Sequence, residues 1–329
     1  MGRFARGVVT VALSDPELEL TLLLERSSDE PALRRAYAGR SIRIAASGQA
    51  RAAARYDAVW YPWNGMRFVS AAPALVTLHD VFAFSEPARG FVARLREQAP
   101  IRRAARRAAR LATDSRFSRE AIVRILGVSA DRITVVGLTP DPYFVPGPRR
   151  PPLELAGRRF VLFVAGPEPR KNAAFFFDAA ARALQRRDEV LALVGTLGAA
   201  DELALRDARV EHVRFDADDA LLRDLYRSAA VVCIPSLAEG FGLVAAEALA
   251  CGAAVIASSA SSLPEVVGDA GLLVDPRDPA AWVRALGAVV ADPALADRLK
   301  TLALKRFPLA DRDRPARETL ALLRGLARN

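Results

Sequence analysis

Long apolar runs are absent from this chain of 329 residues, and cysteine is scarce. No stretch reaches the ~18 uninterrupted apolar residues that a membrane-spanning helix needs. Residues 1–20 carry scattered charges and no small-residue cleavage site, so we expect no secretory signal there. The two cysteines, Cys233 and Cys251, form no C-x-x-C pair. This argues against a zinc site or a disulfide framework and predicts a cytoplasmic protein.

Lysine is the other scarce residue, although the formal net charge is +9, because only three of the 47 basic residues are lysine. A positive balance is typical of proteins that bind nucleic acid, anionic lipid or phosphorylated ligands. Here the heavy use of arginine and alanine indicates a compositional bias. No aromatic–basic interleaving, zinc-finger spacing or RNA-recognition pattern accompanies it, so we expect no nucleic-acid partner. Nucleic-acid binding remains an alternative that a steep salt dependence of affinity would reveal.

The pattern that is present is an alternation of apolar strands and helices, repeated twice. It predicts an α/β fold whose parallel sheets are covered on both faces. Between the two repeats, residues 140–159 hold six prolines and two glycines, a density that no helix or central strand tolerates. We therefore expect an interdomain linker there and two domains, 1–145 and 146–329, with the last helix able to pack back on the first.

In the first domain we expect helices over 2–13 and 88–110 and a further helix that is capped by Ser118 and stops at Gly127. The expected strands are 18–25, 57–62, 74–80, 111–115 and 132–137. Segments 32–39 and 48–55 are expected to be helical or irregular. Those of the second domain are strands over 159–166, 189–195, 209–215, 230–236, 253–258 and 271–276, helices over 172–184, 219–229 and 242–251, and two closing helices.

The strongest chemical signal is the segment PSLAEGFGLVAAEALACG, 235–252. A strand ends here, and a loop with Glu239, Gly240 and Gly242 opens a helix. Ligands of open parallel sheets bind at the carboxyl ends of strands, and a helix N-terminus offers unpaired N–H groups and partial positive charge. Glycines let the backbone approach a ligand closely. Glu247 lies one turn inside the helix, so two carboxylates could grip two hydroxylated parts of one ligand.

A second signal is GPEPRKNAAFFF, 166–177, which follows the first strand of the second domain and opens the next helix. Arg170 and Lys171 stand where that helix begins. Arginine suits bidentate phosphate contact and lysine a point charge. A lysine in a chain that uses arginine almost everywhere is less readily explained by composition. Each segment also has a structural alternative. Arg170 and Lys171 could belong to a solvated basic turn, and the glutamates of segment 235–252 could be ordinary surface residues.

Both segments resemble the family 4 retaining glycosyltransferases of the group 1 type, whose fold is called GT-B. The first matches the family's E-x7-E motif and the second its E-P-R-K-N element. The resemblance implies that Glu239 contacts the donor sugar, that Glu247 contacts the ribose, and that Arg170 and Lys171 hold the diphosphate. The positions that match the first motif are Glu239, Gly240, Phe241, Gly242, Leu243 and Glu247.

The resemblance also gives a role to His79, one of two histidines, which lies in the segment VTLHD of the first domain. It implies a catalytic position at the cleft near the donor sugar and the acceptor. A hydrogen-bonded structural histidine is the alternative. His212 matches no motif, and we interpret it as structural.

The chain departs from the family at its start, because the first element is the helix over 2–13 where relatives have a strand and a Gly-rich loop. The fold that we expect is therefore GT-B, with two facing Rossmann-like doubly wound domains, the N-terminal one lacking its first strand. Ala165 replaces a second phosphate-binding arginine of some relatives, and Ala238 stands where an aromatic often precedes the first glutamate.

The function implied by the resemblance is transfer of a hexose, of mannose or glucose type, from a nucleoside-diphosphate sugar to an acceptor hydroxyl with retention. The acceptor is expected to be a glycan, a lipid-linked molecule or a small molecule. No Asp-x-Asp element is placed to hold a metal, because the carboxylates over 216–219 suit a helix cap, so we expect metal-independent catalysis without a cofactor. The alternative is a nucleotide-sugar-binding protein that has lost transfer activity with its first strand.

The Arg-rich stretch from Arg94 to Arg110 leaves two interpretations open. It could be a solvated helix face, or a peripheral contact with the anionic inner face of a membrane.

Overall fold

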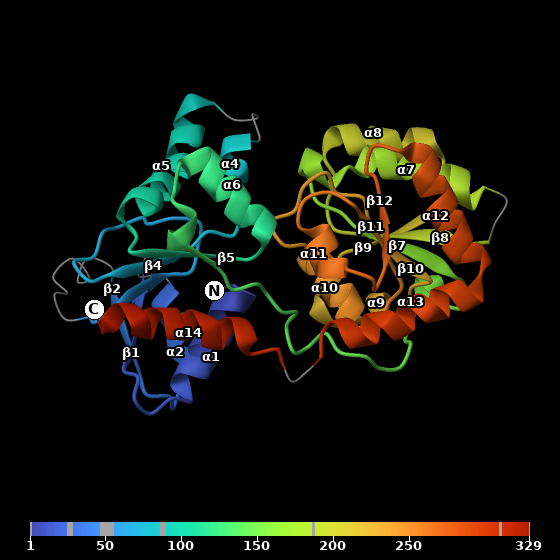
Figure 1. Cartoon of the computed structure of the whole chain (residues 1–329). Coiled ribbons are helices and arrows are strands. Elements are labelled where there is room, and N and C mark those ends of the chain that lie inside the picture. Colours follow the sequence, from blue (N-terminus) through green and yellow to red (C-terminus); the bar gives the residue numbers. More distant parts are fainter. Residues whose placement is uncertain are drawn as a thin grey trace. The chain divides into compact units, whose positions relative to one another are not determined.

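The computed structural model describes residues 2–24, 29–46, 56–85, 90–185, 188–308 and 311–328. The chain divides into two compact units (Figure 1). Unit 1 comprises Met1–Leu138 and Asp313–Asn329, and unit 2 comprises Thr139–Arg312. The segment expected to be helical or irregular over 48–55 lies outside the described residues.

Unit 2 is built on a six-stranded parallel sheet in the order β12-β11-β10-β7-β8-β9. Its strands are β7 (Phe160–Val164), β8 (Val190–Val194), β9 (His212–Phe215), β10 (Val231–Ile234), β11 (Val255–Ser258) and β12 (Leu272–Val274). Its helices are α7 (Ala173–Leu184), α8 (Ala199–Ala208), α9 (Asp219–Ser228), α10 (Leu243–Ala250), α11 (Leu263–Val267), α12 (Pro279–Ala291) and α13 (Pro293–Arg306), with short turns η3 (Leu153–Leu155) and η4 (Pro169–Lys171).

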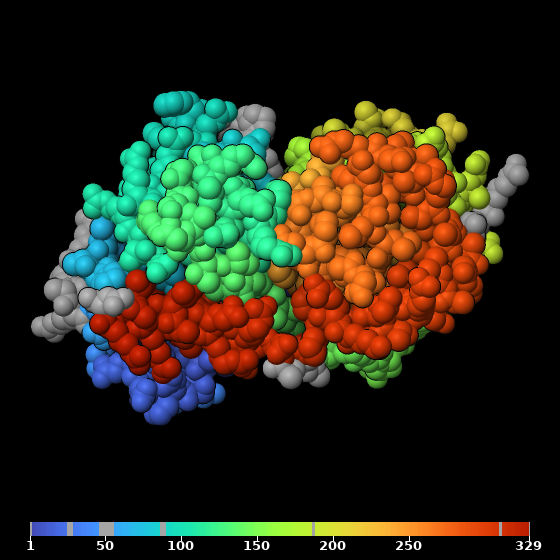
Figure 2. Space-filling model, in the orientation of Figure 1, coloured from blue at the N-terminus to red at the C-terminus, as the bar shows by residue number. Residues whose placement is uncertain are grey.

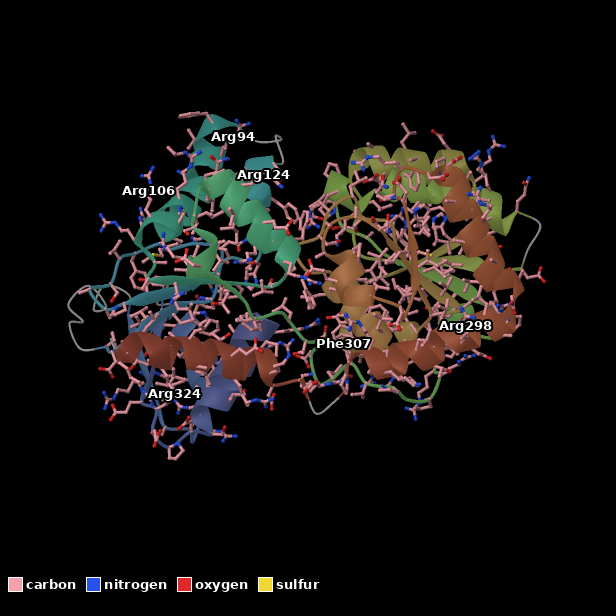
Figure 3. All side chains as sticks on the ribbon, in the orientation of Figure 1. Arg94, Arg106, Arg124, Arg298, Phe307 and Arg324 are labelled. Atoms are coloured by element: carbon pink, nitrogen blue, oxygen red, sulfur yellow. The ribbon has the colours of Figure 1, made fainter. Side chains whose placement is uncertain are left out.

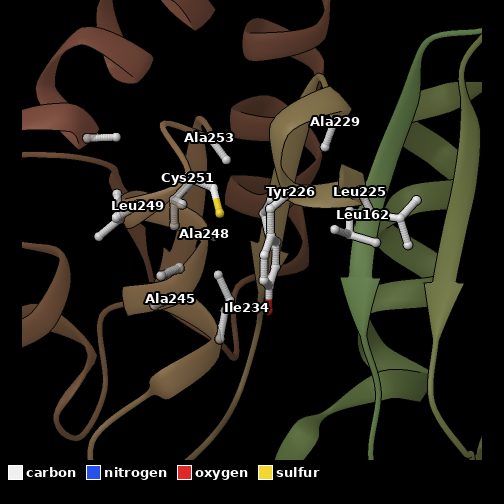
Figure 4. Packing of buried hydrophobic residues seen from close by; sticks show 14 of the residues in the cluster. Leu162, Leu225, Tyr226, Ala229, Ile234, Ala245, Ala248, Leu249, Cys251 and Ala253 are labelled. Carbon is white, nitrogen blue, oxygen red and sulfur yellow. The ribbon is translucent and has the colours of Figure 1, made fainter. Parts of the chain in front are cut away.

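The central strands β7, β8 and β10 are buried on both faces of the sheet, which explains why they are apolar throughout. The edge strand β9 differs, because His212 and Arg214 are exposed. Successive side chains of a strand point to opposite faces. Phe163 of β7 therefore joins one buried cluster with residues of α7 and α12, and Leu162 joins a second cluster with residues of α9 and α10. Figure 4 shows part of the second cluster, in which Tyr226 and Cys251 are buried. The core thus fixes the helices that begin at the carboxyl edge of the sheet.

Unit 1 contains two separate parallel sheets, in the orders β1-β2 and β3-β4-β5-β6. The strands are β1 (Leu20–Leu24), β2 (Ile42–Ala46), β3 (Val59–Tyr61), β4 (Ala74–Thr77), β5 (Arg110–Thr113) and β6 (Ile133–Val135). The helices are α1 (Arg3–Leu13), α2 (Glu30–Ala36), α4 (Phe82–Ser85), α5 (Phe91–Arg107), α6 (Arg116–Leu126) and α14 (Arg314–Ala327), with the short turn η2 (Ala130–Arg132).

Comparison of the strand orders of the two units shows where the sheet of unit 1 is interrupted. There the first strand of the unit, β7, lies at the centre between β8 and β10. Among the residues described in unit 1, no strand takes that place, and β1 pairs only with β2. The expected lack of a first strand in the N-terminal domain stays a prediction.

The C-terminal helix α14 belongs to unit 1, where it packs against α1 (Figure 1). Arg324 of α14 pairs with Asp15, which follows α1. Leu322, Leu323 and Leu326 of α14 cover one face of the sheet, and α5 and α6 contribute to the buried cluster on the other face. No helix in the described part of the chain is long and apolar enough to cross a membrane.

Several local expectations were wrong. Ser115, not Ser118, caps α6, because the Ser115 side chain accepts a hydrogen bond from the amide of Ser118; the helix does end at Gly127, in the left-handed conformation. Strand β2 and helix α8 were not predicted from the sequence. The last strand is followed by three helices instead of two, because Asp292 ends α12 and also caps α13.

Candidate functional site

The site of interest lies at the carboxyl ends of β7 and β10, which are neighbours in the sheet of unit 2. The chain order reverses at this pair: β7 continues to β8 on one side, while β10 continues to β11 on the other. Loops that leave such a pair diverge and open a crevice where ligands of doubly wound sheets bind. The two sequence motifs are the loops that follow these two strands, so the topology brings them together.

The loop after β7 ends in the turn η4, which places Arg170 and Lys171 directly before α7. Asn172 follows in the left-handed conformation, with φ of 59°. The side-chain Nδ2 of Asn172 donates hydrogen bonds to the carbonyls of Pro235, at 3.2 Å, and Pro276, at 2.9 Å. Asn172 therefore ties this loop to those that follow β10 and β12.

The carboxylate of Glu239 is the centre of a compact ion cluster. Arg170 Nη1 donates to Glu239 Oε2 at 3.0 Å, and Lys171 Nζ donates to Oε1 at 2.8 Å. The hydroxyl of Ser236 also donates to Oε1, at 2.8 Å. All three charged side chains are mostly buried. Two cations thus share the carboxylate of Glu239. A second carboxylate stands nearby, because Glu168 Oε1 lies 3.8 Å from Arg170 Nη2.

The backbone of the loop after β10 is held by two serines. Ser261 accepts a hydrogen bond from the amide of Glu239 at 2.9 Å. The hydroxyl of Ser262 lies 2.8 Å from the carbonyl of Glu239 and 2.8 Å from that of Phe241. The side chain of Glu239 therefore projects from a loop that is fixed at several points.

Gly242 is the N-cap of α10 and has φ of 102°, a conformation that residues other than glycine rarely adopt. A Cβ at this position would lie 2.7 Å from a methyl carbon of Leu263. The glycine thus permits both the turn and the close approach of α11. The first amides of α10, beginning with that of Leu243, have no partner within the helix.

Glu247 is buried one turn further along α10. The hydroxyl of Tyr226, from α9, donates to Glu247 Oε2 at 3.3 Å. Tyr226 is itself fully buried, with its ring in the core cluster shown in Figure 4. The core of unit 2 therefore positions this carboxylate.

His79 lies in unit 1, just after β4, with both ring nitrogens engaged. Nδ1 lies 2.8 Å from Asp114 Oδ2, and Nε2 lies 3.0 Å from the carbonyl oxygen of Pro62. Burial alone would lower the pKa of His79, but the hydrogen bond and charge of Asp114, with the Pro62 carbonyl, outweigh it and raise the pKa. Two acceptors facing one ring favour the imidazolium, which carries a proton on each nitrogen.

The structure brings Arg170, Lys171 and Glu239 into direct contact and places Glu247 on the helix that the same loop opens. The functional roles of these residues and of His79 stay predictions. Five supporting residues were not predicted from the sequence: Ser236, Ser261, Ser262, Asp114 and Tyr226. The serines stand within or beside the motifs, but serine is too common for spacing alone to single them out.

In chemical terms, the site offers two cations and a helix N-terminus to an anion, and two carboxylates to hydroxyl groups. The expected metal independence stays a prediction. Over the residues that the structure describes, no three His, Cys, Asp or Glu side chains gather as a metal-binding group. Asp218, within the acidic run 216–219, caps α9 by accepting from the amide of Leu221 at 2.9 Å, which agrees with its expected role.

Comparison with known proteins agrees with this geometry. Residues 158–292 match the family model described as glycosyl transferases group 1. The chain is 34% identical over 223 residues to the O-antigen chain mannosyltransferase B of Escherichia coli, covering 62% of this chain and 58% of that protein. It is 34% identical over 215 residues to a D-inositol 3-phosphate glycosyltransferase of Xylanimonas cellulosilytica, covering 57% of this chain and 50% of that protein.

The chain thus spans between half and three fifths of the length of these two relatives. Among solved structures, the Anabaena protein HepE in complex with UDP-glucose superposes with a TM-score of 0.73 at 19% identity, over 97% of this chain and 95% of that one. At this identity the likeness concerns the fold, and it confirms the expected GT-B class. Residues 158–292, which carry the ion cluster and α10, therefore belong to the glycosyl transferases group 1 family.

Proposed function

We propose that this chain transfers a hexosyl group, of mannose or glucose type, from a nucleoside-diphosphate sugar to an acceptor hydroxyl, with retention of the anomeric configuration. The observation that carries the proposal is the cluster of Arg170, Lys171 and Glu239 at the reversal point of the sheet. Further support comes from the relatives, one named as a mannosyltransferase, and from HepE, which was solved with UDP-glucose.

In the proposed reaction the bond between the anomeric carbon and the diphosphate oxygen breaks, and a bond to the acceptor oxygen forms. The acceptor hydroxyl loses its proton, which the leaving diphosphate would accept. The leaving diphosphate gains negative charge as its bond breaks. Arg170, Lys171 and the amides at Gly242 and Leu243 would stabilise that charge. Removal of one such preorganised contact typically lowers the rate about 10²–10³-fold.

The carboxylates would hold the two ends of the donor. Glu239 would contact the sugar once the diphosphate has taken over the two cations, and Glu247 would contact the ribose from its position beside Tyr226. In unit 1, His79 would act near the donor sugar and the acceptor. Because fixed cations neutralise the diphosphate, we propose that turnover needs no metal, and EDTA should leave it unchanged.

We include a cytoplasmic location and a glycan, lipid-linked or small-molecule acceptor in the proposal. Both cysteines are buried thiols, as suits a reducing compartment.

The decisive experiment measures release of nucleoside diphosphate from a panel of UDP-, GDP- and ADP-sugars in the presence of candidate acceptors. The Lys171→Ala variant should lose turnover, whereas Lys305→Ala, which removes an exposed lysine of α13, should keep it. Turnover that survives Lys171→Ala would overturn the proposed role of the cluster.

One alternative has an observation in its favour: the interrupted sheet of unit 1 fits a protein that binds nucleotide sugars without transferring them. Binding of one nucleoside diphosphate, lost in Lys171→Ala, with no product from any donor and acceptor pair, would support this alternative over transfer.

A further inference from the structure

Trp63 is an exposed tryptophan at the carboxyl edge of the four-stranded sheet of unit 1. It stands two residues after the end of β3, and His79 stands two residues after the end of β4. The two strands are parallel neighbours that pair Tyr61 with Val76, so the loops that carry Trp63 and His79 leave the same edge of the sheet. Trp63 is 53% exposed, which leaves much of its indole open to a ligand on the side where His79 lies.

The residues on both sides of Trp63 are tied to His79. Asn64 Oδ1 accepts a hydrogen bond from the backbone amide of His79 at 2.6 Å. The carbonyl oxygen of Pro62 lies 3.0 Å from His79 Nε2. Trp63 stands between these two contacts in the chain, so its place beside His79 is set by its neighbours and does not depend on burial of its own side chain.

The same loop is braced against α5, the helix on which Figure 3 labels Arg94 and Arg106. Gly65 has φ of 121°, and a Cβ at this position would lie 2.5 Å from the carbonyl carbon of Pro100 in α5. The amide of Met66 donates a hydrogen bond to the Pro100 carbonyl at 3.0 Å. A ligand that binds to a loop held this closely costs little conformational freedom.

The indole itself packs on the beginning of α1. A Cβ at Gly2 would lie 2.8 Å from Cη2 and 2.9 Å from Cζ3 of Trp63, so the six-membered ring lies against the backbone of this glycine. Phe4, in the first turn of α1, meets the ring of His79 edge to face, with 6.0 Å between ring centroids. The open part of the indole thus belongs to a fixed aromatic surface that includes His79.

We propose that the indole of Trp63 stacks on a pyranose ring of the acceptor, so that the acceptor is a carbohydrate. This inference rests on the proposed transfer function and on the proposed position of His79 near the acceptor. A pyranose presents C–H groups on one face and hydroxyl groups around its rim. The C–H groups suit the negative face of an aromatic ring.

The polar groups around Trp63 favour a sugar over an acyl chain. Asn64 and Asp80, the neighbour of His79 in the chain, are both half-buried. An amide can donate to hydroxyl groups and a carboxylate can accept from them. An acyl chain would cover the indole but would desolvate these groups without pairing them, which costs free energy.

Tryptophan fluorescence of the full chain tests the contact in the absence of nucleotide. Trp282 is fully buried and Trp60 is half-buried, so Trp63 is the indole most open to an added ligand. Titration with methyl glycosides of mannose, glucose and galactose, and with disaccharides of these sugars, should change the emission with at least one of them. The change should be absent from Trp63→Phe. No change with any of these sugars would overturn the proposal.

Three replacements separate stacking on a flat ring from general apolar contact. Ligand-observed NMR measures the affinity of each variant for the sugar that the fluorescence titration identifies. Trp63→Ala should weaken binding about 3–10-fold, the range expected for loss of one aromatic contact. Trp63→Tyr retains a flat ring and should recover most of the affinity, whereas Trp63→Leu retains apolar area without a flat face and should not. Equal affinity of Trp63→Leu and the unmodified chain would refute stacking.

Phe91→Ala is the matched control. Phe91 is an aromatic residue of the same unit and is 80% exposed; it begins α5, whose first turns lie at the surface of unit 1 in Figure 2. This variant should bind the sugar as the unmodified chain does. Trp63 and Phe91 are both exposed, so folding should be unaffected, and an unchanged Tm checks this. Equal losses in Trp63→Ala and Phe91→Ala would show non-specific binding and refute the proposal.

The outcome is separable from the proposed transfer activity. The sugar titration contains no nucleotide, and Lys171→Ala should bind the sugar as the unmodified chain does. Sugar binding that depends on Trp63, without turnover of any donor, would count against transfer alone. Turnover accompanied by sugar binding that is indifferent to Trp63 would count against this acceptor contact alone.

Discussion

Replacement of Glu239 by glutamine should have opposite effects on the stability of the free protein and on its affinity for a nucleoside diphosphate. In the structure the carboxylate of Glu239 pairs with both Arg170 and Lys171, the two cations assigned to the diphosphate. Glu239 therefore competes with the ligand. Glu239→Gln retains the shape and one hydrogen-bond acceptor but removes the competing charge.

The contacts set the size of both effects. Unit charges 4 Å apart interact by about 4 kcal/mol at an effective dielectric constant of about 20. The side chains of Arg170, Lys171 and Glu239 are 20%, 16% and 11% exposed, and glutamine still accepts a hydrogen bond, so we discount this figure to about 1–2 kcal/mol. Affinity for the nucleoside diphosphate should then rise about 5–30-fold.

The variant should lose about the same free energy of unfolding without ligand, because two mostly buried cations would lose the negative charge of Glu239. Each kcal/mol corresponds to about 2–4 °C in the Tm of a domain of this size. Thermal unfolding without ligand, and isothermal titration calorimetry with UDP, GDP and ADP, measure the two quantities separately.

Glu189→Gln is the matched control. Glu189 pairs with Arg159 at 3.1 Å, and it directly precedes β8, at the amino edge of the sheet, opposite the candidate site. This variant should lose stability without any change in nucleotide affinity. If Glu239→Gln weakens nucleoside diphosphate binding as much as Lys171→Ala does, Glu239 assists the anion instead of competing with it, and the reasoning is refuted.

Three other predictions concern Tyr226, His79 and Gly242. Tyr226→Phe removes the hydroxyl that lies 3.3 Å from Glu247 Oε2. Calorimetry should therefore show about 3–10-fold weaker binding of the nucleoside diphosphate. An equal loss with the 2′-deoxy ligand would argue against a role at the ribose. Because the pKa of His79 is raised in the folded protein, protonation of its ring stabilises the fold. This stabilisation is complete below the ordinary pKa of about 6.5 and is lost as the pH rises through the folded-state pKa. Urea unfolding should therefore show the stability lost in His79→Gln shrinking with rising pH, and a constant difference would contradict this. Gly242→Ala forces φ of 102° on a residue with a Cβ and should lower stability by about 1–3 kcal/mol, whereas Gly287→Ala, with open space around it, should not.

The sequence by itself determined which segments form the sheet of unit 2 and which residues follow its strands. Apolar runs such as 160–164 and 231–234 suit buried strands of a covered sheet, because their side chains point to both faces. Arg170, Lys171 and Glu239 stand just beyond such runs, so their position at the carboxyl edge follows from local order along the chain. Motif matching over the same segments was enough to name the family of residues 158–292.

The tertiary structure alone decided which of these groups touch. The contact of Glu239 with both cations requires β10 to lie beside β7, although β8, β9 and their helices separate the two strands along the chain. The register pairs Val231 with Val161, so the loops after both strands leave the same edge of the sheet. Strand order depends on how distant segments connect and pack, which local composition does not encode.

The same holds for the other non-local contacts. Both ring nitrogens of His79 are occupied because Asp114 and Pro62 come from other segments of unit 1, and the hydroxyl of Tyr226 reaches Glu247 from a different helix. Local preference sets the elements, whereas the packing of distant segments sets partners, charge state and exposure, and those decide what the site can bind.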